Sequence, residues 1–152
     1  MKRPAFSTLL ANYYSNKVVT RDDLYFEIGW DDLIDNRLYE NTCAVRISLA
    51  LIKSGIPVKG RIRIKAGPHK GKMIEPGLLR LARMLATREY LGKPEKFVIG
   101  NAETEIEGRK GIVAFIKVPG YEGGGHIDLI DECVCASDCY WDAREIWFWE
   151  LT

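Results

Sequence analysis

The sequence predicts a single α+β domain in which N-terminal helices pack on a mostly antiparallel sheet. Helical periodicity is confined to the first 91 residues, whereas residues 96–151 contain short runs rich in β-branched and aromatic residues. Helices followed by strands in one chain are typical of an α+β arrangement. The 152 residues suffice for a core of their own, and no repeat or linker divides them, so we expect one domain spanning residues 1–152.

Composition narrows the class of protein. Apolar residues make up 47% and charged residues 28% of the chain, and the net charge is +1 with both signs interspersed. These values are typical of a globular protein and favour neither a nucleic-acid nor a membrane partner. The longest apolar runs are too short to span a bilayer, and the basic N-terminus lacks a signal-peptide cleavage site. We therefore expect synthesis in the cytoplasm without a signal peptide.

Three segments of the N-terminal half have apolar residues at helical spacing, and two segments between them do not. Ser7 is a candidate N-cap of the first helix, Asn41 or Thr42 of the second, and Gly55 ends the second. The expected helices are 6–14, 43–55 and about 76–91, whereas 22–41 is expected to be irregular and 60–77 to be a loop with one short strand at most.

The C-terminal half contains the expected strands. The aromatic run Trp147, Phe148 and Trp149 is better explained as core on both faces of a central strand than as a platform for sugars. The four strands are expected at 96–100, 110–118, 126–130 and 145–151.

Cys43 stands at the first turn of the second predicted helix, where the apolar stripe begins. The positive end of a helix dipole favours a thiolate over a thiol, so a cysteine at this place suits a nucleophile. A cysteine with only a structural role could occupy any position on the buried face of the helix. The position therefore predicts a reactive thiol that needs a base from elsewhere in the chain.

The chain has two histidines that could be this base. His69 lies in a polar loop and is better explained as a solvated residue. His126 follows Gly124 and Gly125 at the start of a predicted strand, where glycines let the backbone approach a substrate closely. A cysteine at a helix start with a histidine at a distant strand start is typical of papain-like thiol hydrolases, which selects His126.

A third group should orient the imidazole, and three aspartates follow His126. Asp128 lies on the same face of the predicted strand as His126, so it could be near the imidazole without facing the far side of the ring. Asp131 is further along the chain. Asp138 falls where an adjacent strand would return, so we rank it first. Each of the three could instead be a surface acid.

Four stretches together resemble the type VI secretion amidase effectors of family 4, bacterial toxins with an NlpC-type papain-like fold. They are YENTCAVRIS (39–48), GGGHIDL (123–129), CASDCYW (135–141) and EIWFWEL (145–151), and the likeness extends over nearly the whole chain. The resemblance implies an amidase that hydrolyses the bond between D-glutamate and meso-diaminopimelate in peptidoglycan stems. It implies a triad of Cys43, His126 and Asp138, an acyl-enzyme, and neither a metal nor another cofactor.

The resemblance has further implications for the site and its surroundings. Tyr39 and Asn41 would line the substrate cleft, although packing against the helix start explains Tyr39 equally well. Cys135 and Cys139 keep the Cys-x-x-x-Cys spacing common in the family and would form a disulfide in an oxidising periplasm.

The same resemblance implies partners and a place of action. The protein would be exported by the type VI secretion apparatus and would act in the periplasm of the target bacterium. A cognate periplasmic immunity protein would block its cleft, with the glycines before His126, Gly124 above all, at the contact.

Other functions stay open at this point. Cys133, Cys135 and Cys139 with His126 could form a Cys₃His zinc site of a non-enzymatic or interaction module, although the ligands are crowded into one short segment. An acyltransferase or transpeptidase would use the same thiol chemistry as a hydrolase. The basic residues of 60–72 could meet carboxylates, but a solvated loop explains them better.

Overall fold

The computed structural model describes residues 3–98, 100–120 and 124–152. Its α-helices are α1 (Phe6–Ala11), α2 (Arg21–Glu27), α3 (Cys43–Lys53), α4 (Leu78–Leu85) and α5 (Ala102–Ile106), with 3₁₀ turns η1 (Asp31–Leu33) and η2 (Arg37–Tyr39). Its strands are β1 (Ile62–Arg63), β2 (Met73–Ile74), β3 (Glu95–Val98), β4 (Lys110–Ile116), β5 (Gly125–Asp131), β6 (Val134–Cys135) and β7 (Glu145–Glu150).

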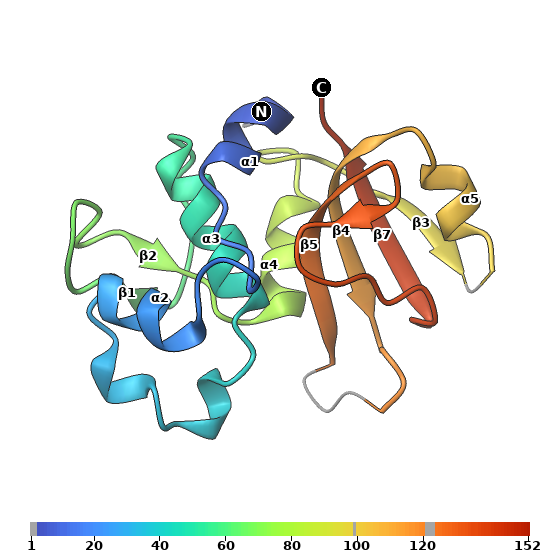
Figure 1. The fold of residues 1–152 in the computed structure, drawn as a ribbon. Helices are drawn as coiled ribbons and strands as arrows, with labels where there is room; N and C mark the ends of the chain where they lie inside the picture. The colour runs from blue at the N-terminus through green and yellow to red at the C-terminus, as the bar shows by residue number, and fades with distance from the viewer. Residues whose placement is uncertain (1–2, 99, 121–123) are drawn as a thin grey trace.

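The main sheet is antiparallel throughout, with strand order β3-β7-β4-β5-β6, and the short hairpin β1-β2 stands apart from it. Helices α1 to α4 lie on one side of the molecule and the main sheet on the other, with α3 and α4 next to β5 (Figure 1). Within the described residues, no helix is both long and apolar enough to cross a bilayer.

The core fills both faces of the sheet. One cluster joins the helices to one face and includes Trp147 and Trp149, and a second cluster on the opposite face includes Phe148 and the α5 residues Ala102 and Ile106. Strand β7 lies between β3 and β4. The prediction that the aromatic run is core on both faces of a central strand is therefore confirmed.

Helix α3 begins at Cys43 as predicted, with Thr42 as its N-cap residue and Gly55, at φ 86°, beyond its end. Two other helices differ from the prediction. Helix α1 begins at Phe6 with Ala5 as N-cap, so Ser7 is not the cap, and it ends at Ala11.

Helix α4 ends at Leu85, short of the predicted residue 91. The Thr87 hydroxyl donates to the Met84 carbonyl (2.7 Å) and the Leu91 N–H donates to the Leu85 carbonyl (2.9 Å). Since these bonds turn the chain back on itself, the helix cannot continue.

The prediction that residues 22–41 are irregular is wrong at the start of that range, because α2 lies there. Thr20 caps α2 by accepting the N–H of Asp23 (3.2 Å), and Leu24 and Tyr25 are buried in the core. A capping threonine followed by acidic residues in the first turn is a sequence signal for the start of a helix. The loop predicted for 60–77 contains the paired strands β1 and β2, and neither α5 nor β6 was predicted.

Candidate active site

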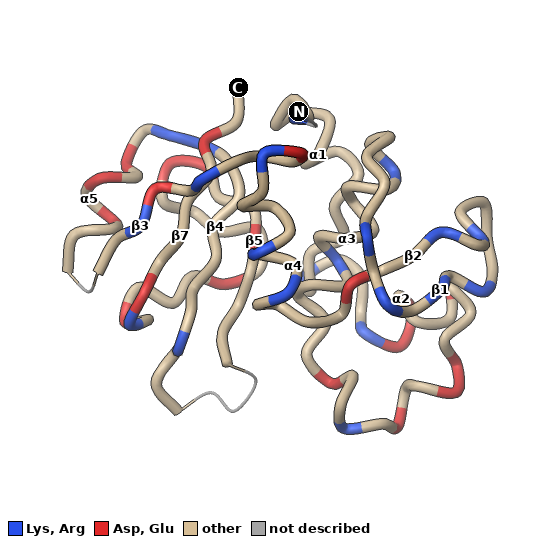
Figure 2. The backbone as a smooth tube through the Cα atoms, turned by 180° about the vertical axis from the view of Figure 1, so that it is seen from behind, with Lys and Arg blue, Asp and Glu red and all other residues tan. Residues whose placement is uncertain are grey.

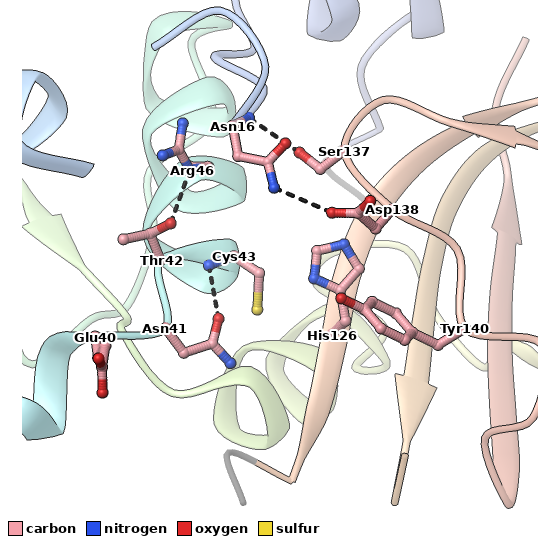
Figure 3. Close-up of a pocket in the computed structure, with 10 residues that line it drawn as sticks. All are labelled: Asn16, Glu40, Asn41, Thr42, Cys43, Arg46, His126, Ser137, Asp138 and Tyr140. Atoms are coloured by element: carbon pink, nitrogen blue, oxygen red, sulfur yellow. Dashed lines mark hydrogen bonds between the residues drawn. The ribbon is translucent and has the colours of Figure 1, made fainter. Parts of the chain in front are cut away.

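The thiol of Cys43 lies at the N-terminus of α3, on the wall of a pocket of about 180 Å³ (Figure 3). The residue is 4% exposed. Its backbone N–H donates to Oδ1 of Asn41 (3.2 Å), and Nδ2 of Asn41 donates to the Gly125 carbonyl (3.3 Å). Asn41 therefore ties the start of α3 to the start of β5, which brings Cys43 next to the strand that carries His126.

The imidazole of His126 points into the same pocket from β5, with one nitrogen turned towards the sulfur of Cys43 (Figure 3). The other nitrogen, Nε2, is hydrogen-bonded to Oδ2 of Asp128 (2.8 Å). The ring stacks on Phe115, with 6.3 Å between centroids, and Tyr140 packs edge-on at 5.3 Å. The side chain thus packs against two aromatic rings and is bound at one nitrogen, which leaves Nδ1 for the thiol.

The carboxylate that binds the imidazole is that of Asp128, and it is completely buried. Its Oδ1 accepts the N–H of Leu129 (2.8 Å), and its Oδ2 accepts the N–H groups of Ser137 (2.9 Å) and Asp138 (3.0 Å) besides the imidazole. Four hydrogen-bonding partners thus surround this carboxylate, as the burial of a polar group requires. Asp128 is therefore equipped to hold His126 in one orientation.

Asp138, which the sequence ranked first, does not reach the imidazole in this way. The returning segment turns its backbone N–H towards Asp128, while the Asp138 carboxylate accepts from Nδ2 of Asn16 (3.1 Å) at the pocket wall. Asp131 is exposed at the far end of β5, opposite Lys110. Of the three candidate aspartates, Asp128 is the one that the structure hydrogen-bonds to the imidazole among the described residues.

His126 is set up to carry a positive charge. Burial alone would lower its pKa, but the hydrogen bond to Asp128 and the neighbouring Cys43 thiol outweigh burial and raise the pKa to about 9. At neutral pH the ring is therefore an imidazolium, the form that pairs with a thiolate and can protonate a leaving group.

The structure separates the other residues that the sequence assigned to the cleft. Asn41 lines the catalytic pocket, whereas Tyr39 packs edge-on against Trp30 in the core, with 6.3 Å between the ring centroids. Gly125 is buried and must be glycine, since a Cβ there would collide with the Phe115 carbonyl. Gly124 borders a neighbouring groove. Gly123 lies outside the described residues.

Sequence reasoning missed the polar support of the pocket. Buried Arg46 donates to the Thr42 hydroxyl (2.8 Å) and to the carbonyls of Tyr14 (3.1 Å) and Val19 (2.7 Å), which holds the segment containing Asn16 over α3. The Ser137 hydroxyl accepts the N–H of Asn16 (3.1 Å). An arginine inside the apolar stripe of a buried helix was the signal that could have revealed this support.

The cysteine cluster forms a disulfide between Cys135 and Cys139, and Cys133 is free. The zinc alternative needed all three thiols and His126 as ligands, but two thiols are bonded to each other and the imidazole is bonded to Asp128. Among the described residues no group of three potential ligands is assembled for a metal ion. The disulfide instead closes the loop whose Ser137 and Asp138 amides hold Asp128.

A thiol at a helix N-terminus that faces an imidazole on an antiparallel sheet places the protein in the papain-like class, in its NlpC-type form. The chain belongs to the family of type VI secretion system (T6SS) amidase effector protein 4, Tae4, whose family model matches residues 39–149. The resemblance drawn from the sequence is confirmed. No curated protein matches the sequence significantly.

Solved structures agree with this assignment of the fold. A chain of the Tae4–Tai4 effector–immunity complex from Enterobacter cloacae superposes with a TM-score of 0.79 at 22% identity, covering 99% of both chains. Tae4 from Enterobacter cloacae alone gives 0.79 at 22% identity over 100% of both chains. The complex from Salmonella Typhimurium gives 0.78 at 19% identity over 99% of this chain and 100% of that chain. The predicted α+β papain-like fold is thereby confirmed.

Proposed function

We propose that this amidase effector is a cysteine amidase that hydrolyses the bond between D-glutamate and meso-diaminopimelate in peptidoglycan stems. The observation that carries the proposal is the Cys43–His126–Asp128 arrangement in one pocket, with the histidine pKa raised to about 9. A family of amidase effectors supplies the reaction type. The particular bond comes from the family resemblance.

The geometry supports a two-step mechanism. The Cys43 thiolate attacks the amide carbonyl and forms a thioester, while the His126 imidazolium gives its proton to the departing amine. Neutral His126 then takes a proton from water as the water attacks the thioester. Asp128 keeps the ring oriented throughout, through its hydrogen bond to Nε2.

The backbone N–H of Cys43 is suited to stabilise the oxyanion. It stands at the positive end of α3 beside the attacking sulfur, and without substrate it donates to Asn41 Oδ1. Substrate binding would exchange that amide oxygen for the developing oxyanion. Asn41 thus has two tasks, because its Nδ2 also holds the Gly125 carbonyl.

We further propose export by type VI secretion, action in the periplasm of the target bacterium, and restraint by an immunity protein. The family is one of type VI effectors, and the similar structures include Tae4–Tai4 complexes from Enterobacter cloacae and Salmonella Typhimurium. A pocket of about 180 Å³ is small enough for one inserted loop to block.

Digestion of purified muropeptides followed by mass analysis tests the function. We expect fragments ending in D-glutamate and fragments beginning with meso-diaminopimelate, and no products from Cys43→Ala. Cleavage at another bond would overturn the assigned specificity, and undiminished cleavage by Cys43→Ala would overturn the thiol mechanism. An added amine that is incorporated in place of water would show an acyltransferase.

A further inference from the structure

A second hollow lies beside the catalytic pocket, between the start of α4 and the ends of β4 and β5. Its volume is about 370 Å³, larger than the 180 Å³ of the catalytic pocket. Leu78, Leu79 and Ile116 give it apolar walls, and Leu79 is 39% exposed. We call it the α4 groove, and it is also lined by the basic side chains Arg61, Arg80 and Lys117.

The α4 groove and the catalytic pocket are neighbours. Asn41 lines the catalytic pocket and is hydrogen-bonded to the carbonyl of Gly125. Gly125 lies so close to Leu78 that a Cβ on it would stand 2.8 Å from Leu78 Cδ2, and Leu78 is a wall of the groove. The bond from Asn41 to Gly125 and the closeness of Gly125 to Leu78 thus link the described linings of the two hollows, which are near enough to each other to serve one bound peptide.

The basic side chains of the groove differ in whether a carboxylate among the described residues binds them. Arg61 is bound through two hydrogen bonds by the buried carboxylate of Glu75, at 3.0 and 2.8 Å. Arg80 and Lys117 are exposed, and within the described residues neither forms an ion pair with a carboxylate. Seen from behind, basic positions lie along α4 and beyond the end of β4 (Figure 2). Two cations above an apolar floor are thus available to a ligand.

The catalytic pocket, by contrast, has few side chains that could bind an anionic ligand. Its described lining includes the carboxylates of Glu40 and Asp138. Of its two basic side chains, Arg46 is buried and already donates to a hydroxyl and two carbonyls, and the imidazolium of His126 is bound to Asp128 and faces Cys43. A substrate carboxylate next to the scissile bond would therefore gain a counter-charge in the α4 groove and not beside Cys43.

We propose that the α4 groove is a subsite for a carboxylate-bearing part of the stem peptide, and that Arg80 and Lys117 determine this specificity. The inference rests on the proposed function, because a peptidoglycan stem combines small aliphatic groups with free carboxylates on either side of the bond that is cut. Apolar walls fit the aliphatic parts and the two cations fit a carboxylate.

The test is a kinetic comparison of Arg80→Gln, Lys117→Asn and the double variant with the unaltered protein. Asparagine suits position 117, because Lys117 has φ 59° and asparagine tolerates that backbone. Arg83→Gln, exposed on the same helix but outside the groove, is the matched control. The substrates are a tripeptide stem with all carboxylates free and two stems in which either the D-glutamate carboxylate or both diaminopimelate carboxylates are amides.

We expect the double variant to raise KM for the free-acid stem about tenfold while kcat stays nearly constant, as for loss of uniform binding. One of the amidated stems should be insensitive to the variant, and its identity shows which carboxylate the groove binds. Equal losses on all three stems, no loss at all, or the same loss in Arg83→Gln would overturn the subsite.

A binding titration of the same stems with Cys43→Ala separates this proposal from the proposed function. Binding that weakens on amidation and in the Arg80 and Lys117 variants supports the subsite even if the unaltered protein cleaves another bond. Cleavage of the expected bond without any such charge dependence would leave the function standing and remove the subsite.

Discussion

The two walls of the catalytic pocket are held in place by different interactions. The wall that carries Cys43 is α3, in which ten of eleven residues are buried, so packing along the whole helix fixes the proposed nucleophile. The wall that carries His126 depends on a few hydrogen bonds to Asp128, two of them from the loop closed by Cys135 and Cys139.

This difference predicts where the site is vulnerable. Packing is spread over many contacts, so single changes on α3 away from Cys43 should alter stability more than chemistry. The hydrogen bonds at Asp128 are few and cooperative, so changes there should alter chemistry first. The predictions below test that contrast, beginning with the largest effect.

Removal of either reacting group should abolish cleavage. We expect Cys43→Ala and His126→Ala each to lower kcat/KM by about 10⁴-fold or more, since groups that act as a unit are lost together. Both variants should keep the circular dichroism spectrum of the unaltered protein. Muropeptide turnover measures the effect, and a double variant much weaker than either single variant would contradict a shared catalytic unit.

The two aspartates should differ strongly. Asp128→Ala removes the partner of the imidazole and leaves the N–H groups of Leu129, Ser137 and Asp138 without an acceptor. We expect a loss of about 10²- to 10⁴-fold in kcat and about 3 kcal/mol in the free energy of unfolding. Asp138→Ala removes only a bond to Asn16 and should lower kcat less than about threefold.

Paired kinetics and thermal denaturation of the two aspartate variants decide the matter. A larger kinetic loss in Asp138→Ala than in Asp128→Ala would restore the original ranking from the sequence and reject the orienting role given to Asp128.

The position of Cys43 on α3 could be predicted from the sequence more fully than the surroundings of His126 on the sheet, for a physical reason. Position 43 follows from local signals, namely helical periodicity and the stop at Gly55, which packing of α3 reinforces. The four main strands also follow from local sequence patterns, and β3, β4, β5 and β7 occur near their expected positions.

The choice between Asp128 and Asp138 depends on the direction in which a loop faces after the chain returns, and no local pattern encodes that. Strand alternation does place His126 and Asp128 on one face, about 6.6 Å apart along β5. The turn at Glu132 and Cys133, both at positive φ, then presents the amide of residue 138 in place of its carboxylate. Sequence position alone therefore does not decide which of the two aspartates contacts the ring.

The pH dependence of cleavage should report the protonation state of His126. Because the pKa of His126 is raised to about 9, the ring loses its proton only as the pH rises through that value, and cleavage should fall there with the general acid. The contribution of this pair to stability has the same sign: it is fully present below pH 6.5 and is lost as pH rises through about 9.

Asp128→Asn should move the alkaline limb of kcat/KM to lower pH, since the hydrogen bond to a carboxylate is one of the causes of the raised pKa. Asp138→Asn is the control and should leave the limb in place. An unchanged limb in Asp128→Asn would show that Asp128 does not control the protonation of His126.

The smallest expected effect belongs to the disulfide, and it tests whether the loop acts through Asp128. Cys135→Ser/Cys139→Ser opens a loop of sequence separation 4, so it should cost about 2 kcal/mol or less of unfolding free energy. Without the bond, the amides of Ser137 and Asp138 are less well ordered around Asp128, and kcat should fall about three- to tenfold. Reduction of the unaltered protein should have the same effect.

In an Asp128→Ala background the cysteine changes should lose their effect on kcat, because the group they support is gone. An undiminished effect in that background would mean that the disulfide supports the site by a route other than Asp128.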